Sequence, residues 1–535
     1  MIRKAALLLR TVRYLRWRQI YFRFYYRARD GFRSLFARGF RYPQSIEKKV
    51  KPFPLKFAGS LNSRRSYHDD EFTFLNCSKK FGGAIGWNFG GYGRLWGYNL
   101  NYFDFLNQAG MDREIGLGLI TDFIGGMEAN RAGLEPYPLS LRIMNWIKFL
   151  IRHGVRNRAI DGPLYAQALI LLDNLEYHLM GNHLLENGFA LLFAGLYFND
   201  PALRAKAREI LIKELDEQIL DDGAHFELSP MYHQIMLFRL LDGFNLLRKN
   251  PSAENSSPDS EILEVLRGKA SQMLGWLLRM TFRNGDIPLL NDSAHNIAPT
   301  SAELKAYASR LGIGAAVVKL GKSGYRKIDK PGYEAVIDIG DIGPDYIPGH
   351  AHNDIFSFVL NVAGKPLIVD TGTSTYEAGP VRVCQRSTAA HNTVTVEDKE
   401  QSEMWGSFRV GGRAHVRDVA EGEDFVSATH DGYERLGALH TRRFEFGGDH
   451  VIINDTVSSA KDFRCSAYLH FHPWVRVSMD NGGKNIAADG AKIRFCGSRS
   501  VALEHYEYAP EFNMSIRAPV AVIPFQGNLK TEIFV

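Results

Sequence analysis

The chain has 535 residues, of which 45% are hydrophobic and 23% are charged, and its formal net charge is +6. This composition is typical of a globular protein and excludes general disorder, and the length predicts about two to four domains. The four cysteines lack the paired spacing of a zinc knuckle or a disulfide framework. They are Cys77, Cys384, Cys465 and Cys496.

The positive charge is concentrated at the N-terminus. Residues 1–41 carry twelve lysines and arginines against one acid, Asp30, so the rest of the chain sums to about −5. Aromatic and leucine side chains are interleaved with these cations at helical spacing, which would suit an anionic membrane surface or a docking partner. The alternative is a helical arm packed on the body with a solvated basic face. No nucleic-acid-binding motif accompanies the charge, so nucleic acid is not an expected partner.

The early apolar run at residues 5–9 is too short for the core of a secretory signal, and Arg10 and Arg13 follow it at once. No other segment approaches the roughly 20 apolar residues that a membrane helix needs. We therefore expect a cytoplasmic or membrane-peripheral location in preference to secretion, with the periplasm as an alternative.

Hydrophobic periodicity divides the chain into three parts: a basic arm and lead-in over 1–90, a helical domain over 91–320 and a β-sandwich over 321–535. The predicted helices are 115–129, 138–154, 163–180, 183–198, 201–220, 230–248, 260–282 and 301–312. The predicted strands are 335–339, 357–362, 366–369, 393–396, 443–446, 451–454, 475–477 and 520–523. A ligand cleft is expected at the junction of the two large domains.

The strongest local signal is the segment GHAHND, which precedes a predicted strand. If an extended conformation begins at His350, a period of two places His350, His352 and Asp354 on one face. Asp370 ends one predicted strand and His391 enters another, and a His/Asp/His set suits zinc. Each histidine alone is more often a structural residue, but three such positions at strand edges favour a common site.

Two predicted helix starts also carry polar side chains. In GNHLLEN, helical spacing places His183 and Asn182 beside Glu186, and the helix dipole would help both to hold a carboxylate. The alternative is an Asn N-cap with a Glu resembling that of a capping box. In DGAHFELSPMYH, Tyr232 lies in the first turn, where a lowered pKa would let it exchange a proton with a sugar oxygen; packing is the alternative.

Further distinctive segments include VDTGTSTY, RSTAAHNTVTVEDKEQSEMWGSFRVG, LWGYNLNYFDFL and PYPLSLRIMNWIKFL. As an ordered set over roughly residues 90–420, all these motifs resemble the heparinase II/III polysaccharide lyases. The resemblance implies an incomplete (α/α) toroid followed by an antiparallel β-sandwich. It also implies cleavage of a uronate-containing acidic polysaccharide by β-elimination.

The resemblance also implies residue roles. Asn182 and His183 are similar in position to residues that bind the uronate carboxylate, with Glu186 beside them. Tyr232 resembles the catalytic tyrosine and His350 the catalytic histidine; either His350 or a tyrosinate would remove the C5 proton, and Tyr232 would protonate the departing O4.

In metal-binding relatives the zinc ligands correspond to His352, Asp370 and His391, where zinc holds the site in shape without activating a water. No organic cofactor is expected. Tyr376 is a candidate second tyrosine. Aromatic and basic residues of the helical part would line the glycan cleft, with core packing as the alternative for Trp146: Trp96, Tyr98, Tyr137, Arg142 and Trp146.

Two other functions remain open. A glycoside hydrolase would need two carboxylic acids about 5–10 Å apart, and Glu186 is the only obvious carboxylate outside the metal set. A non-catalytic glycan-binding or assembly protein would keep the fold and the cleft. The basic arm in place of a secretory signal fits metabolism of a cell-surface polysaccharide from inside the envelope better than digestion of an external one.

Overall fold

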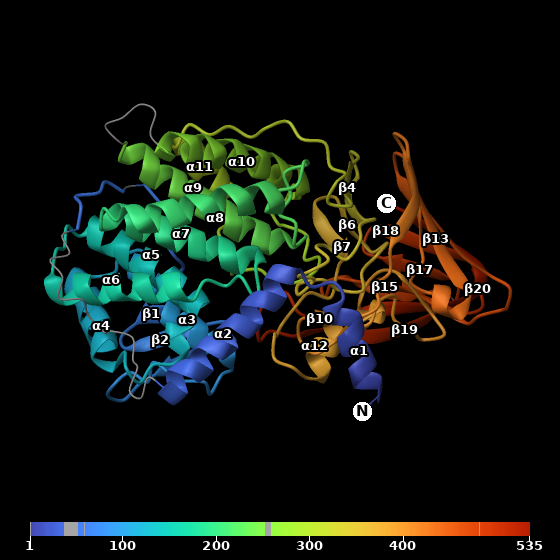
Figure 1. Ribbon diagram of the computed structural model, residues 1–535. Helices are drawn as coiled ribbons and strands as arrows, with labels where there is room; N and C mark the ends of the chain where they lie inside the picture. Colours follow the sequence, from blue (N-terminus) through green and yellow to red (C-terminus); the bar gives the residue numbers. More distant parts are fainter. Residues whose placement is uncertain (1, 37–51, 58, 252–257, 481) are drawn as a thin grey trace.

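The computed structural model describes residues 2–36, 52–57, 59–251, 258–480 and 482–535. It contains a helical domain, a β-sandwich beside it and a helical N-terminal arm (Figure 1). Among the described helices, none is long and apolar enough to cross a membrane. All four cysteines are free thiols.

The helical domain is an incomplete (α/α) toroid. Its helices are α3 (Arg94–Tyr102), α4 (Arg113–Gly126), α5 (Pro136–Arg152), α6 (Arg158–Asp173), α7 (Gly181–Tyr197), α8 (Pro201–Gln218), α9 (Pro230–Lys249), α10 (Pro258–Met280) and α11 (Ser301–Arg310). The odd-numbered helices α3, α5, α7, α9 and α11 contact one another in that order, while α4 contacts α6 and α8 contacts α10. Alternate helices therefore form two layers, and all eight predicted helices are confirmed, although α6 ends well before the predicted residue 180.

Sequence signals fix where the helices begin. The side chain of Asp200 accepts hydrogen bonds from two backbone N–H groups of α8, and that of Ser229 accepts one from Tyr232 N in α9. Proline occupies the first turn of α5, α8 and α9, where its missing N–H costs nothing. The first turns of α5, α7 and α9 carry Tyr137, His183 and Tyr232, although α7 begins without a side-chain cap or a proline.

The lead-in belongs to the helical domain. It forms a small antiparallel sheet of β1 (Tyr67–His68), β2 (Glu71–Phe74) and β3 (Cys77–Lys80). Phe72, Phe74 and Trp87 are buried in the same core as Trp96 and Trp146. Residues 67–87 thus close one side of the toroid.

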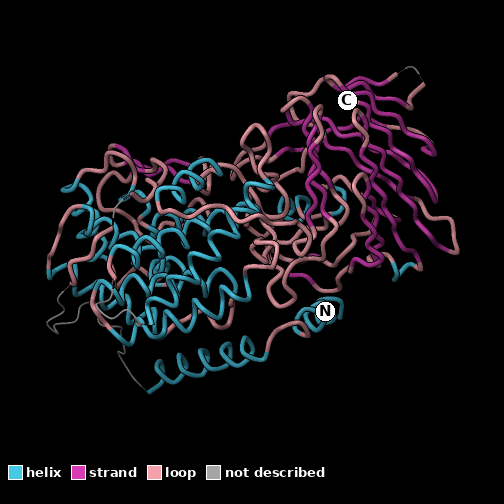
Figure 2. The backbone as a smooth tube through the Cα atoms, turned by 90° about the horizontal axis from the view of Figure 1, so that it is seen from above, coloured by secondary structure: helices cyan, strands magenta, loops and turns pink. Residues whose placement is uncertain are grey.

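The sandwich contains a four-stranded sheet, β4 (Tyr325–Asp329), β5 (Tyr333–Asp338), β6 (Phe358–Val362) and β7 (Lys365–Ile368). The main strands of the large sheet run in the order β11 (Val416–Glu421), β12 (Phe425–His430), β13 (Ala438–Phe446), β14 (His450–Ser459), β20 (Ile516–Phe534), β18 (Ala491–Ser498), β17 (Asn485–Ala488) and β16 (Val477–Met479). Off this path lie β8 (Val394–Val396), β15 (Cys465–His470) and β19 (Ala502–Tyr508). Apart from β1–β3, the strands gather at one end of the molecule, and most of the helices lie at the other (Figure 2).

Loops and short elements fill the junction, among them α12 (Pro380–Gln385), β9 (Met404–Trp405) and β10 (Arg409–Val410). The predicted strands all lie in or beside observed ones; the strand predicted at 475–477 instead begins at Val477. In β13 and β14 buried and more exposed residues alternate, as expected for a sheet with one face in the core.

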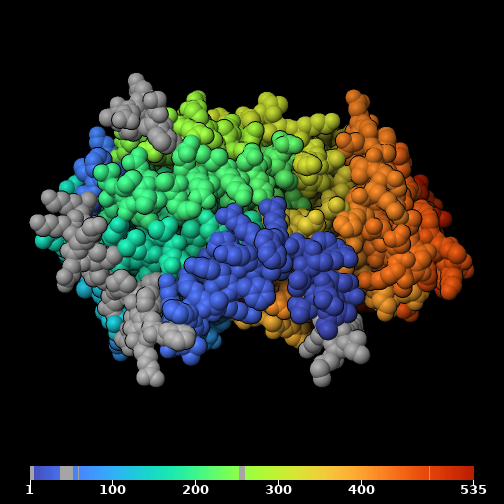
Figure 3. All heavy atoms as spheres, in the orientation of Figure 1, coloured from blue at the N-terminus to red at the C-terminus, as the bar shows by residue number. Residues whose placement is uncertain are grey.

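The N-terminal arm over residues 2–36, here called the strap, contains α1 (Ile2–Val12) and α2 (Trp17–Phe36). It lies across the junction between the two domains (Figure 3). Arg10 of α1 pairs with Glu403 of the sandwich at 2.6 Å. Gln19 of α2 donates to the backbone oxygen of Leu179 in the toroid and to that of Tyr346, which lies between β5 and β6. The strap therefore contacts both domains, in agreement with the alternative in which the arm packs on the body.

Candidate functional site

Side chains from both domains meet at the junction. The ring of His350 lies 3.9 Å from the ring of Tyr232, measured between centroids. The Tyr232 hydroxyl is 3.3 Å from that of Tyr376, and His350 Nε2 is 3.6 Å from a carboxylate oxygen of Glu227. The structure thus brings together three residues that the sequence placed on separate segments, and it adds Glu227.

The start of α7 is built around a glycine. Gly181 has φ of +58°, and a Cβ there would stand 2.6 Å from Glu227 Oε1, so only glycine fits. The next residue, Asn182, donates its backbone N–H and its side-chain amide to the two oxygens of Glu227, at 2.9 and 2.7 Å. Asn182 is buried, and Glu227 links it to His350.

His183 is the more accessible of the two predicted carboxylate-binding residues. Its Nδ1 is 3.0 Å from Glu176, and its ring lies 4.5 Å from that of Tyr137. Burial alone would lower the pKa of His183, but the charge and hydrogen bond of Glu176 outweigh it and raise the pKa above its ordinary value. Glu176 therefore favours the protonated form of His183 in the first turn of α7.

Asp292 is the centre of the sandwich side of the site. Its carboxylate accepts hydrogen bonds from Nδ1 of His350 and Nε2 of His352, both at 2.9 Å, and from both terminal nitrogens of Arg382. Burial alone would raise the pKa of Asp292, but the Arg382 charge and the two histidine hydrogen bonds hold it well below its usual range. Asp292 is therefore a buried anion that fixes both rings.

The sequence analysis missed this residue and its partner Arg382. The run NDSAH around Asp292 carries no spacing that signals a site, because the carboxylate works through contacts 58 to 90 residues away. Glu227 and Glu176 lay inside or next to quoted motifs without an assigned role. The polar Asn-Asp-Ser run between two predicted helices was the one signal available in the sequence.

The expectation that His350, His352 and Asp354 share a strand face is wrong. Residues 350–357 form an irregular loop, with Phe356 at φ of +68°, and β6 begins at Phe358. The two histidines nevertheless converge because the loop folds around Asp292. Both histidines are held together by hydrogen bonds to one carboxylate, and not by the pleat of a strand.

The two tyrosines are neutral groups in this setting. Burial and the neighbouring Tyr376 raise the pKa of Tyr232 well above its ordinary value. Burial and the charge of Asp292 do the same for Tyr376. Each hydroxyl is therefore held in its protonated form, and the lowered pKa expected for Tyr232 is wrong for this structure.

The predicted metal ligands lie together behind this cluster. The rings of His352 and His391 are 5.3 Å apart, and His391 Nδ1 pairs with Asp370 at 2.7 Å. His352 Nδ1, His391 Nε2 and Asp354 Oδ2 are buried without a hydrogen-bond partner. As the side chains stand, no group of three acidic, His or Cys residues in the described ranges is arranged to hold a metal ion. The donor chemistry fits zinc, since imidazoles paired with carboxylates and left with a free nitrogen are usual zinc ligands.

Several predicted cleft residues are internal. Arg142 is fully buried and donates to Gln167 and to the backbone of Asn101 and Gly133. Glu186 is fully buried against Arg239, with 2.8 Å between their atoms. Trp96 and Trp146 have no exposed surface. The prediction that Arg142, Glu186 and Trp96 contact a glycan is therefore wrong for this structure, whereas Tyr98 and Tyr137 are partly exposed.

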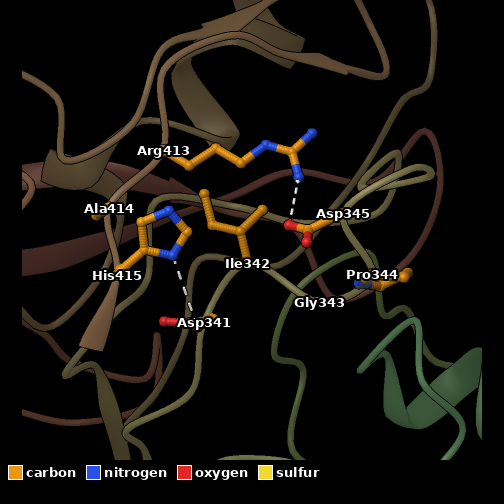
Figure 4. Close-up of a pocket in the computed structure, with 8 residues that line it drawn as sticks. All are labelled: Asp341, Ile342, Gly343, Pro344, Asp345, Arg413, Ala414 and His415. Carbon is orange, nitrogen blue, oxygen red and sulfur yellow. Dashed lines mark hydrogen bonds and ion pairs between the residues drawn. The ribbon is translucent and has the colours of Figure 1, made fainter. Parts of the chain in front are cut away.

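The cavity drawn in Figure 4 is a different place. It is lined by Asp341, Ile342, Gly343, Pro344, Asp345, Arg413, Ala414 and His415. Two ion pairs join residues of its lining, Arg413 with Asp345 and His415 with Asp341. None of the predicted site residues lines it, and Arg413 stacks on Tyr14 of the strap at 3.6 Å. This cavity therefore lies where the strap contacts the sandwich.

Two family models match consecutive parts of the chain. Residues 163–310 match the model of the heparinase II/III N-terminus, and residues 313–534 match that of the heparinase II/III-like C-terminal region. Together they cover more than half of the sequence.

Curated relatives match part of the chain. A heparin-sulfate lyase from Bacteroides stercoris is 26% identical over 250 residues, or 42% of this chain and 36% of that protein. FtsZ-localized protein C from Caulobacter vibrioides is 25% identical over 363 residues, or 62% of this chain and 59% of that protein. The chain spans less than two thirds of the length of these relatives.

Solved structures share the fold. A heparinase III crystal structure has a TM-score of 0.65 at 15% identity, covering 92% of this chain and 87% of its own. A chondroitin AC lyase of Streptomyces coelicolor A3 has a TM-score of 0.50 at 12% identity, covering 83% and 74%. At these identities the likeness concerns architecture.

Proposed function

Because the chain belongs to the heparinase II/III family, we propose that it is a polysaccharide lyase that cleaves a uronate-containing acidic glycan by β-elimination. One observation carries the proposal. Tyr232 lies against both His350 and Tyr376 at the junction, and in the first turn of α7 Glu176 raises the pKa of His183. A base, an acid and a carboxylate-binding cation are the groups that this elimination needs.

The carboxylate of the uronate is the first requirement. Its C5 proton is too weakly acidic to leave unless the charge that develops on the carboxylate is stabilised. His183 and the remaining amide N–H of Asn182 would supply hydrogen bonds at the first turn of α7, where the helix dipole is positive. Glu176 supports this role because it raises the pKa of His183.

Proton transfer then divides between two side chains. Asp292 accepts from His350 Nδ1, which leaves Nε2 free to take the C5 proton. The C5–H electrons form the C4–C5 double bond as the C4–O4 bond breaks, and the Tyr232 hydroxyl gives its proton to O4. The resulting phenolate recovers a proton from the adjacent His350. The raised pKa of Tyr232 keeps its hydroxyl protonated, so Tyr232 is available as the acid and the role of base is left to His350.

The direct test is an ultraviolet scan with acidic glycans: heparan sulfate, hyaluronan, chondroitin, alginate and bacterial capsular polymers. A lyase creates a C4–C5 double bond that absorbs near the ultraviolet edge. New reducing ends without that absorbance would indicate a hydrolase and refute the proposal. Bound glycan with neither product would indicate a binding protein.

Replacing Glu176 with Gln should change the pH dependence of substrate binding. Binding needs protonated His183, so it is lost as pH rises through the His183 pKa. Because Glu176 raises that pKa, Glu176→Gln should make KM rise at a lower pH than in the native enzyme, within about pH 5–8. KM and kcat measured against pH, with the exposed Glu209→Gln as the matched control, check this. Identical KM profiles would contradict the role of Glu176.

Zinc is the expected metal, held by His352 and His391 with Asp370. When bound it would hold the sandwich side of the site in shape. We expect near-stoichiometric zinc by elemental analysis and a higher melting temperature when zinc is added. His391→Ala should remove both effects, while exposed His415→Ala should keep them. A native protein that takes up no zinc would refute the metal site without touching the lyase proposal.

A further inference from the structure

The outer face of the strap is apolar although it faces solvent. Along α2 the large exposed side chains recur at helical spacing and form one stripe. They are Trp17 (77% exposed), Tyr21 (50%), Phe24 (68%), Tyr25 (44%), Phe32 (61%) and Leu35 (71%). Single exposed apolar residues are ordinary, but a continuous stripe marks an interaction surface. In Figure 2, α2 runs along the rim of the molecule.

This stripe is not what attaches α2 to the body. The opposite face of the helix does that: Gln19 is buried, Phe22 lies 4.7 Å from Tyr177 between ring centroids, and the Tyr26 hydroxyl donates to the backbone of Leu175. The helix thus has two apolar faces. One is used by the toroid and the other points away from it.

Two arginines lie together on one side of the outer face. Arg23 and Arg27 are exposed, and within the described part of the chain no carboxylate forms an ion pair with either. Partial burial and, to a smaller extent, the charges of Arg409 and Arg27 lower the pKa of Arg23, so these three cations lie near one another. Positive potential therefore accompanies the stripe, while the chain beyond residue 41 is net negative.

We propose that the strap binds an anionic phospholipid surface while it remains docked on the protein. Trp17 and Phe24 would enter the headgroup boundary, and Arg23 and Arg27 would contact lipid phosphates. Tryptophan and tyrosine suit this boundary because each has an apolar ring and a polar edge. A hydrophobic groove on a protein would explain the aromatic stripe but not the unpaired arginines beside it.

The test uses the full-length chain and vesicle flotation, without glycan, so its outcome is independent of lyase activity. We expect binding to vesicles of mixed phosphatidylglycerol and phosphatidylcholine, and at least about tenfold weaker binding to phosphatidylcholine alone. The double variant Trp17→Ser/Phe24→Ser should bind the anionic vesicles at least about tenfold more weakly. Trp474→Ser is the matched control, because Trp474 in the sandwich is also 77% exposed.

Two further measurements complete the test. Brominated lipids should quench part of the native tryptophan fluorescence, and Trp17→Phe should remove that part while retaining binding. Arg23→Gln/Arg27→Gln should weaken binding to anionic vesicles only. The proposal is overturned if the native chain does not float, if the stripe variant floats equally well, or if the stripe instead mediates self-association on size exclusion without vesicle binding.

Discussion

Replacing Tyr232 with Phe is expected to lower the rate of elimination by about 10²–10⁴-fold, the usual contribution of a positioned acid or base. The substitution removes one oxygen, whose only hydrogen-bond partner among the described residues is the Tyr376 hydroxyl at 3.3 Å. The ring that stacks on His350 remains, so the fold should be preserved. The measurement is kcat by ultraviolet absorbance, together with the melting temperature.

The controls separate chemistry from packing. Tyr197→Phe removes a hydroxyl at the far end of α7, where it donates to Asp161, and should leave kcat unchanged. Tyr376→Phe removes the neighbouring hydroxyl and should cost less than Tyr232→Phe. If Tyr376→Phe is inactive and Tyr232→Phe is not, the acid is Tyr376 and the assignment is wrong.

Replacing Asp292 with Asn should cost both activity and stability. Asn cannot supply the charge that Arg382 requires, and both residues are fully buried. Breaking a buried pair typically costs about 3–5 kcal/mol because it leaves an uncompensated charge. His350 also loses the carboxylate that holds its Nδ1 proton, so kcat should fall by about 10²–10⁴-fold. Denaturant unfolding and initial rates measure the two losses separately.

A double variant distinguishes the two effects. Asp292→Asn/Arg382→Met removes both charges and should recover much of the lost free energy of unfolding. It should not recover kcat, because His350 still lacks its anionic partner. Recovery of activity along with stability would mean that Asp292 acts only as a counter-ion for Arg382.

The fold was largely predictable because its elements carry strong local signals. Proline and capping residues mark the starts of α8 and α9, and alternation marks β13 and β14. The end of α6 was not, because the apolar pattern continues past Asp173 into a loop that packs in the core through Leu175 and Tyr177. Burial, not helicity, explains those apolar residues.

The site was predictable only where a motif carries it. Tyr232, His350 and Tyr376, which the resemblance singled out, lie close together, and their catalytic roles stay predictions. Asp292 was missed because its role depends on tertiary contacts alone. Arg142 and Trp96 were misplaced for the same reason. The sequence pattern of a helical domain does not distinguish an arginine or a tryptophan that lines a cleft from one that is buried in the core.

The position of Gln19 has a thermodynamic consequence. Its amide joins the backbone of Leu179, three residues before Asn182, to that of Tyr346, four residues before His350. Attachment of the strap and occupancy of the junction therefore stabilise the same arrangement of the two domains. By linkage, a glycan that requires that arrangement should tighten attachment of the strap by the same factor by which an attached strap tightens glycan binding.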